Sequence, residues 1–511
     1  MEAASLPRGG TRPLQSVAEA ARSRSRAFWI VAGLMLGAAA LRFATLGVQS
    51  YHHDEIVTAS RILRGSFGHA MDAVGFSEST PPLYYALAWG WVQLTGTGEW
   101  GLRSLSALAG VLTVPVAYLI AAELRGRRAG LWAAALVAFN PMLLWYYQEA
   151  RAYSLLVLFS SLSLLWCIRG ARSGRRRDFI WWGVFSGLAL ATHYFAVFPL
   201  VAELVVLLRR RGRAALVGIG VLVAFALALA PLAFHQMSSG HAEWIGGLSL
   251  GHRLWESAGT FVTGETADII GEAERPGFAV FPLAVCAAAF ALLLWRGGRE
   301  ERRSAALPLG VAVCAIGIPV AMALVASGKD FVLARNLIPA LVPLLVVVAI
   351  AVSLPAARRL GAVLGTALVI YSLGFCVAAS TEPSLQRPNW DAVAAKLGEP
   401  TGPRAMVTWT LGEASLRYYL STGAFQVRAS EGNPWFVHEV DFISDGKAPP
   451  PGPHVLGPRF RESDSYDAGR LYIRRYTLPG PSLARVQLSR LREPNLNFRT
   501  TGVLLDGIGP S

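Results

Sequence analysis

The chain has 511 residues, of which 53% are hydrophobic and only 16% are charged. A soluble protein of ordinary composition carries about 25% charged residues, so the composition predicts a polytopic membrane protein. The formal net charge of +14 does not predict nucleic-acid binding, because the excess arginine lies in short segments between apolar runs, where membrane topology explains it. The four cysteines lie inside apolar runs without metal-ligand spacing, so no disulfide framework is expected.

Arginine-rich clusters separate the long apolar runs. They are Arg22/Arg24/Arg26, Arg125/Arg127/Arg128, Arg175/Arg176/Arg177, Arg209/Arg210/Arg211, Arg299/Arg302/Arg303 and Arg358/Arg359. Short loops rich in Lys or Arg stay in the cytoplasm, so the clusters are expected on the cytoplasmic side. The segments with acidic, histidine and tyrosine side chains then fall on the opposite, outer side of a cell membrane. This segregation is the main clue to function.

The apolar runs predict an α-helical polytopic membrane protein with a cytoplasmic N-terminus. A span needs about 20 apolar residues, and the whole chain predicts about 11 to 13 transmembrane helices. Eleven are assigned: residues 28–48, 101–122, 129–145, 152–168, 179–193, 194–208, 214–234, 278–295, 305–326, 333–354 and 362–379. The first is read as a retained span, because no small-residue cleavage site follows it.

Two apolar stretches are too short for ordinary spans. Residues 81–95 begin at a Pro-Pro pair and are read as an in-plane or re-entrant helix, with a true span as the alternative. Residues 179–208 must cross twice, because arginine clusters flank both ends of the stretch. The tip of this short hairpin, at His193 and Tyr194, is therefore expected at or below the outer surface.

These boundaries divide the chain into three parts. Residues 1–26 form a basic cytoplasmic tail, and residues 27–380 form a transmembrane domain with outer loops at 49–100 and 235–276. Residues 381–511 form a small α/β extracytoplasmic domain with a loop-rich tail. In that domain residues 404–409 and 471–476 are predicted as strands, and residues 390–397 and 413–420 as helices.

An acidic pair, Asp54 and Glu55, follows the first span directly after His52 and His53. Apolar residues at helical spacing follow the pair, so it is expected to lie at the start of an interfacial helix. Such a pair serves as a general base, as a metal site or as a solvated loop, and the residues leave all three open. Asp54 and His53 are the candidate ligands of a divalent metal.

Positive charges on the outer side are exceptions to the topology rule, and such exceptions are candidates for function. They are Arg103, Arg151, Lys329 and Arg335. The planar guanidinium suits phosphate oxygens, and Tyr147 and Tyr153 beside Arg151 add hydroxyl donors. An anionic ligand that arrives from the lipid would explain this set. A belt of interfacial aromatics around a snorkelling arginine is the structural alternative.

Four motifs together resemble the membrane-embedded glycosyltransferases of the GT-C type. They are the acidic pair after the first span, Thr80-Pro81-Pro82-Leu83-Tyr84-Tyr85, Leu102-Arg103-Ser104-Leu105, and the stretch from Asn140-Pro141 to Tyr147-Gln148-Glu149-Ala150-Arg151-Ala152-Tyr153. The similar branch comprises protein O-mannosyltransferases, lipid A aminoarabinose transferases and galacturonosyltransferases. The resemblance covers residues 28–350, and Arg335-Asn336-Leu337 departs from the Arg-Tyr pairing expected of that branch.

The resemblance implies a polyprenyl-phosphate-linked sugar donor and an extracytoplasmic glycan, lipid or protein acceptor. Asp54 would be the general base or a metal-contacting carboxylate, with Glu55 as its acidic neighbour. Arg151 and Tyr153 would contact the donor phosphate, and Pro81, Pro82, Tyr84 and Tyr85 would shape the entrance for the lipid carrier, near His193 and Tyr194. One assigned base predicts a single inverting displacement. A transporter or flippase for a lipid-linked saccharide is the alternative, although internal repeats are not visible.

Overall fold

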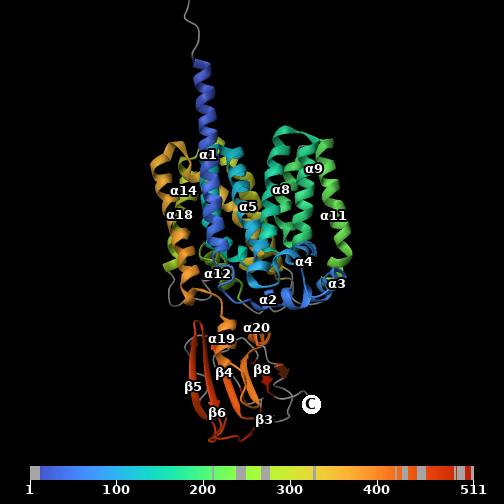
Figure 1. Cartoon of the computed structure of the whole chain (residues 1–511). Coiled ribbons are helices and arrows are strands. Elements are labelled where there is room, and N and C mark those ends of the chain that lie inside the picture. The colour runs from blue at the N-terminus through green and yellow to red at the C-terminus, as the bar shows by residue number, and fades with distance from the viewer. Residues whose placement is uncertain are drawn as a thin grey trace, which may run out of the picture.

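A helical bundle and a separate β-sheet domain make up the molecule in the computed structural model (Figure 1). The structure describes residues 12–209, 212–237, 245, 249–265, 277–325, 330–420, 423–427, 435–445, 456–487, 491 and 501–507, without the side chains of 12–24, 410, 427, 445, 501 and 502. The bundle is formed by the chain up to about residue 381, and the sheet domain follows it.

Long apolar helices build the bundle. Eight described helical segments are long and apolar enough to cross a membrane. They contain α1 (Arg12–Phe43), α5 (Glu99–Arg125), α8 (Tyr153–Ser173), α11 (Arg213–Met237), α14 (Gly277–Arg296), α15 (Arg299–Val325), α16 (Ala334–Leu337) with α17 (Leu341–Val352), and α18 (Arg358–Thr381). The helices α6 (Arg127–Phe139) and α7 (Pro141–Tyr147) form a further span bent by 56°.

These helices account for nine of the eleven assigned spans. The bend lies at Asn140-Pro141, where proline lacks the N–H that would continue the helix. The two others coincide with α9 (Arg176–Thr192) and α10 (Val197–Arg209), of 17 and 13 residues. They are shorter than a full span, as expected for the 179–208 hairpin. The Pro81–Thr95 stretch is α4 (Leu83–Thr95), which also is too short to cross.

Small residues let the helices pack closely. A Cβ on Gly183 of α9 would overlap the carbonyl oxygen of Gly218 in α11, so this helix pair requires glycine at its contact. The segment Ala334–Val352 lies in the centre of the bundle, and 89% of the residues in its apolar stretch are buried. The lipid-facing helices expose side chains such as Leu216 and Leu227. A nonpolar exterior around a buried central helix is the arrangement of a membrane domain.

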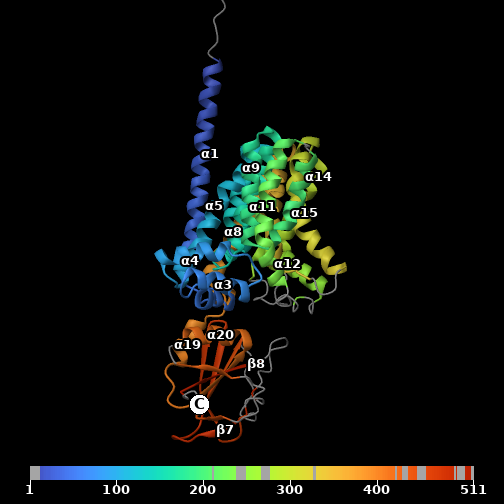
Figure 2. The ribbon, with the colours of Figure 1, turned by 90° about the vertical axis from the view of Figure 1, so that its right-hand side faces the viewer.

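The arginine-rich helix ends meet at one end of the bundle. Arg125 pairs with Glu300 and Glu301, and Arg128 donates to the carbonyl oxygen of Arg358. The opposite end faces the sheet domain, and α1 projects beyond the arginine-rich end (Figure 2). The structure therefore separates the arginine clusters from the polar motifs, as the sequence predicted.

Short helices cover the domain-facing end of the bundle (Figure 1). They are α2 (His53–Ile56), the π-helix Val57–Ile62, α3 (Phe67–Ser77), α4, and α12 (Leu250–Thr263). Gln236 at the end of α11 ties this layer to the bundle: its Nε2 donates to the carbonyl oxygens of Val74 and Thr80, and it accepts from the hydroxyl of Tyr194. The outer layer is thus fixed to the spans beneath it.

A six-stranded mixed sheet with two helices forms the terminal domain. The strand order is β2-β8-β1-β4-β6-β5, and β1 pairs with β4 in parallel and with β8 antiparallel. A second, two-stranded sheet pairs β3 with β7. The elements are α19 (Trp390–Leu397), β1 (Arg404–Trp409), α20 (Thr410–Tyr419), β2 (Phe425–Val427), β3 (Trp435–Val437), β4 (Glu439–Asp445), β5 (Arg461–Ala468), β6 (Leu471–Thr477), β7 (Ala484–Val486) and β8 (Thr501–Asp506).

The predicted helices and strands of this domain all occur, with small differences in their ends. The sequence prediction missed the strands β2, β3, β4, β5, β7 and β8 and described the tail as rich in loops. The first five residues of β5 are polar and exposed, so its sequence lacks the apolar alternation that indicates a half-buried strand. The strand β8 returns to the sheet between β2 and β1, a long-range pairing that local pattern does not reveal.

Candidate active site

The acidic pair lies on α2, at the domain-facing end of the bundle. His52 is the N-cap of this one-turn helix, and its backbone N–H donates to Oε2 of Glu55 at 3.0 Å, as in a capping box. The helix continues as the π-helix Val57–Ile62, a rare element found most often at functional sites. The sequence thus forms a fixed helical start at the pair, as predicted.

Glu55 is fully buried and held from several directions. Arg103 donates to both carboxylate oxygens, from Nε and from Nη2, at 2.7 Å each. Arg387 donates to Oε2 at 3.1 Å, and the backbone N–H of Ala150 donates to Oε1 at 2.9 Å. Burial would raise the pKa of Glu55, but the two arginines outweigh it and lower the value to about 2. Glu55 is therefore an anchoring anion between α2, α5 and the segment before α8.

Asp54 lies beside this anchor in a different environment. Its side chain is 23% exposed, whereas that of Glu55 is not exposed at all. Nε2 of His53 lies 2.9 Å from its Oδ1, and Nη1 of Arg335 lies 3.6 Å from its Oδ2. Burial would raise the pKa of Asp54, but the hydrogen bond and charge of His53, together with Arg151 and Arg335, lower it well below its usual value. The carboxylate is thus ionised and open on one side.

Arg335 reaches Asp54 because the segment before it is clamped. Arg253 of α12 donates from Nη1 to Oδ1 of Asp330 at 2.7 Å and to the carbonyl oxygen of Val332 at 2.9 Å. The same Asp330 oxygen accepts from the backbone N–H of Val332. This clamp fixes the turn from which α16 starts and points Arg335, whose side chain is 31% exposed, toward α2.

Arg151 is paired with a second carboxylate. Its Nη1 and Nη2 donate to Oε1 and Oε2 of Glu78 at 3.0 and 2.9 Å, a bidentate geometry that orients the guanidinium. Aromatic rings line the space next to it: Tyr153 lies 4.9 Å from Tyr146 and 5.7 Å from His193 between ring centroids. The Tyr146 hydroxyl donates to Glu265. The site therefore has a wall of rings beside two arginines.

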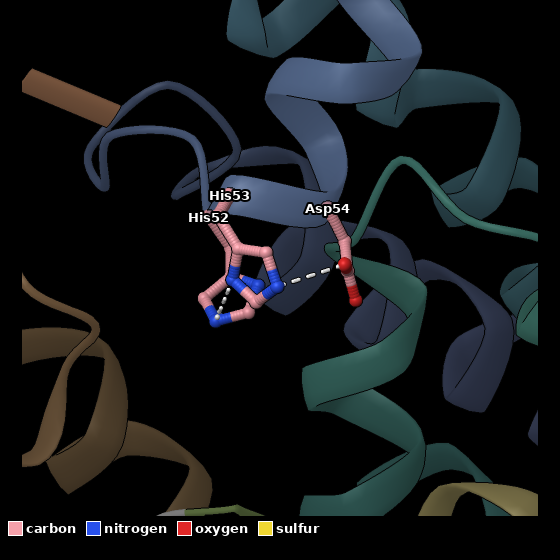
Figure 3. A group of neighbouring side chains, drawn as sticks. All are labelled: His52, His53 and Asp54. Carbon is pink, nitrogen blue, oxygen red and sulfur yellow. Dashed lines mark hydrogen bonds and ion pairs between the residues drawn. The ribbon is translucent and has the colours of Figure 1, made fainter. Parts of the chain in front are cut away.

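The predicted metal ligands cluster with one further histidine. One ligand atom each from His52, His53 and Asp54 lies within 4.8 Å of the others (Figure 3). Two imidazoles and one carboxylate, with an open fourth position, are a ligand set that zinc accepts in enzymes. In the structure His53 bridges the other two, since its Nδ1 lies 3.2 Å from Nε2 of His52. The residue types fit a divalent cation, and binding one would replace these two contacts.

The remaining predicted residues lie around this centre at different depths. Tyr84 and Tyr85 are fully buried at the start of α4, and the Tyr85 hydroxyl lies 3.3 Å from Oγ1 of Thr80. Pro81 and Pro82 form the turn before them. Tyr147 points into the bundle, where its ring packs against the guanidinium of Arg42. Lys329 lies outside the described residues.

The sequence analysis missed four charged residues of this site. Glu78 and Arg253 hold Arg151 and the Arg335 segment, as described above. Glu149 is buried, and Nη2 of Arg387 donates to its Oε2 at 2.9 Å. Burial raises the pKa of Glu149 to about 7, against the opposing charge of Arg387. Glu149 stood inside a quoted motif, but Arg387 belongs to the terminal domain and no sequence signal connects it with the acidic pair.

Comparison with known proteins agrees with this architecture. Residues 79–236 match the family model described as dolichyl-phosphate-mannose-protein mannosyltransferase. No curated protein matches the chain. The solved structure of ArnT from Cupriavidus metallidurans in the apo state is similar, with a TM-score of 0.54 and 16% sequence identity over 89% of this chain and 98% of that chain. The same protein bound to undecaprenyl phosphate gives a TM-score of 0.50 and 16% identity over 87% of this chain and 97% of that one.

The family match over residues 79–236 agrees with the resemblance that the motifs indicated, and the description of that family names a lipid-phosphate-linked sugar. The structural likeness also confirms the fold: a polytopic helical membrane protein with a terminal domain built on a mixed β-sheet.

Proposed function

We propose that this chain, whose residues 79–236 carry the mannosyltransferase family match, transfers a sugar from a polyprenyl phosphate to an acceptor on the extracytoplasmic side of the membrane. The observation that carries the proposal is the approach of Arg335 to Asp54, at 3.6 Å. An ionised, partly exposed carboxylate beside a partly exposed guanidinium offers a base and an anion site next to each other. Transfer from a phosphate donor needs both.

The reaction assigned to this site is a single displacement. The acceptor hydroxyl oxygen attacks the anomeric carbon of the sugar, and Asp54 takes the proton of that hydroxyl. The bond between the anomeric carbon and the phosphate oxygen breaks, and its electron pair leaves with the polyprenyl phosphate. The nearby cation Arg335 stabilises the charge that develops on the phosphate oxygen. The configuration at the anomeric carbon is inverted.

The other carboxylates support inversion. A double displacement needs a second carboxylate about 5 Å from the first to act as nucleophile. Glu55, Glu78 and Glu149 are all buried and engaged by arginine in the structure, and Glu265 accepts from the Tyr146 hydroxyl. We therefore assign Asp54 alone to the chemistry, and Glu55 and Arg103 to holding α2 in place.

Arg151 and Tyr153 remain the proposed contacts for the donor phosphate region, with Arg335 as the principal cation. Arg103 is removed from this set, because its guanidinium already donates to Glu55 and to the carbonyl oxygens of Leu46, Gln49 and Ser50. The turn at Pro81-Pro82 and the following Tyr84 and Tyr85 are proposed to shape the entrance of the lipid carrier.

The proposed orientation follows from the arginine-rich end of the bundle. Since short basic loops stay in the cytoplasm, the Asp54 end and the sheet domain would face the extracytoplasmic side. A polyprenyl phosphate in the outer leaflet would then meet the site at the membrane surface. The acceptor, whether glycan, lipid or protein, would approach from the side of the sheet domain.

A divalent cation at His52, His53 and Asp54 stays a prediction. When bound, such an ion would contribute a Lewis acid close to the leaving phosphate. The zinc affinity is measured by titrating zinc into the metal-free wild type and into His52→Ala, with the exposed His69→Ala as the matched control. Weaker binding only in the His52 variant supports the site, and equal binding in all three proteins rejects it.

The test of the proposed function is transfer of a labelled sugar from a polyprenyl phosphate by the purified chain in detergent or liposomes. We expect a new glycosidic bond to appear in an acceptor fraction from the cell envelope. The transporter alternative predicts movement of the labelled lipid across the bilayer without a new bond. That result would overturn the proposal.

A further inference from the structure

Arg387 is a buried residue of the terminal domain that reaches into the bundle. It lies in the segment between α18 and α19, and its side chain is 5% exposed. One end of its guanidinium donates to Glu55 at 3.1 Å, and the other donates to Glu149 at 2.9 Å. Its guanidinium also packs over the ring of Trp145, 4.6 Å from the centroid. One side chain thus bridges two segments of the membrane domain.

Both bridged segments carry residues of the proposed reaction centre. Glu55 is the residue after Asp54, on the one-turn helix α2. Glu149 lies two residues before Arg151, in the turn between α7 and α8. The backbone N–H of Ala150 donates to Glu55, so the two segments are already in contact. Arg387 adds a second link between the two segments, because it donates to Glu55 on one and to Glu149 on the other.

The contact is part of a wider seam between the domain and the bundle. The backbone N–H of Arg387 donates to Gln49, and Ser50 donates to the carbonyl oxygen of Pro388 and accepts from the backbone N–H of Trp390. Farther along the seam, the Tyr419 hydroxyl donates to Glu99 at 2.6 Å and accepts from the backbone N–H of Tyr51. The seam therefore fixes residues 49–55 to the sheet domain at both ends.

We propose that Arg387 is a positioning residue through which the sheet domain holds Asp54 and Arg151 in their working geometry. This inference rests on the proposed function, because it assigns Asp54 and Arg151 to the reaction. Arg387 acts through Glu55 and Glu149 and does not contact the substrate. Transfer then requires the sheet domain to be seated on the bundle, so docking of that domain is a condition for catalysis.

The chemistry of the bridge explains why arginine is required. A guanidinium offers a planar fork that reaches two separate acceptors, whereas the ammonium of lysine is a single point charge. Without Arg387, Glu55 keeps the bidentate pair with Arg103, but Glu149 loses its hydrogen-bonded cation in a buried place. A buried carboxyl without its partner either carries an uncompensated charge or takes up a proton. Both changes remove the tie to Arg387, so the turn that carries Glu149 is expected to shift or open.

The test compares Arg387→Lys and Arg387→Ala with the full-length wild type, and uses Arg417→Ala, an exposed arginine of α20, as the matched control. Transfer kinetics are measured together with amide hydrogen exchange and with binding of undecaprenyl phosphate. We expect both Arg387 variants to lower kcat by about 10- to 100-fold, the cost of misplacing reacting groups by a fraction of an ångström to 1 Å. The KM for the donor should change much less.

Amide exchange separates positioning from general damage. In Arg387→Lys it should rise in residues 49–56 and 145–151 and stay unchanged in β1, while Arg417→Ala behaves as wild type throughout. Wild-type kcat and wild-type exchange in Arg387→Lys would overturn the inference, and so would increased exchange spread evenly over the bundle and the sheet. If wild type shows no transfer at all, the proposed function fails, whereas the exchange data still report whether Arg387 holds the two segments.

Discussion

Arg335 lies 3.6 Å from Asp54, although Asp54 follows the first span and Arg335 stands at the start of a late one. The ion pair brings a cation to the acidic pair from a segment that is distant in the sequence of the membrane domain. It depends on the Arg253–Asp330 clamp, which fixes the backbone just before α16. The proposed reaction centre is therefore assembled only when the early and late helices have packed together.

Replacing Arg335 should weaken binding of the donor phosphate. A hydrogen bond to a charged group contributes about 1.5 to 3 kcal/mol, so Arg335→Ala should weaken binding of undecaprenyl phosphate by about 10- to 100-fold. Arg335→Lys should restore part of the loss, because it keeps the charge without the fork. Binding is measured by fluorescence or calorimetry, with the exposed Arg61→Ala as control. Equal affinities in wild type and Arg335→Ala would remove Arg335 from the phosphate site.

Arg103 is expected to matter for stability more than for donor contact. Removing one partner of a buried ion pair costs about 3 to 5 kcal/mol, because the other charge stays buried without its partner. Arg103→Met should therefore lower the melting temperature strongly. Arg177→Met, which breaks an ion pair at an arginine that is 72% exposed, should change it little. Thermal unfolding in detergent compares the two, and similar melting temperatures would contradict the anchoring role of Arg103.

The protonation of Glu149 should appear in the pH dependence of stability. Its pKa is raised by burial to about 7, whereas a glutamate in an unfolded chain titrates near about 4.3. The folded chain therefore binds this proton more tightly than the unfolded chain does. The resulting stabilisation of the folded state is fully present below the unfolded pKa and is lost as the pH rises through the folded pKa. As the pH rises from about 4.3 to about 7, the melting temperature of wild type should fall more than that of Glu149→Gln. Parallel curves for the two proteins would contradict the shift.

The orientation of the bundle is open to direct labelling. If the arginine-rich end is cytoplasmic, a membrane-impermeant maleimide should label Asp72→Cys, an exposed position of α3, in intact spheroplasts. Arg177→Cys at the opposite end should react only after permeabilisation. The reverse pattern would place Asp54 in the cytoplasm and would exclude an outer-leaflet donor.

Local patterns predicted the membrane domain well. Apolar length and arginine clusters located the spans, and the bend at Asn140-Pro141 follows from the missing N–H of proline. Arg151 could be singled out because it lies apart from the arginine clusters, and the acidic pair because it follows the first apolar run directly after two histidines. These features depend on residues that are close in sequence.

Long-range pairings could not be predicted in the same way. Arg387 meets Glu55, and β8 pairs with β2 and β1, only because distant segments pack together. The roles within the acidic pair also depend on packing: Glu55 is enclosed by two arginines, whereas Asp54 stays partly open. Neighbouring residues with the same charge thus receive different environments that no local pattern distinguishes.

The most direct measurement is the rate of sugar transfer by Asp54→Asn, compared with wild type and with the exposed control Asp72→Asn. Asparagine keeps the shape of the side chain but cannot take the proton of the acceptor hydroxyl. If Asp54 is the general base, we expect kcat to fall by about 100- to 10,000-fold, the usual contribution of such a group. Binding of undecaprenyl phosphate and the melting temperature should be retained. Full activity of Asp54→Asn would contradict this role of Asp54.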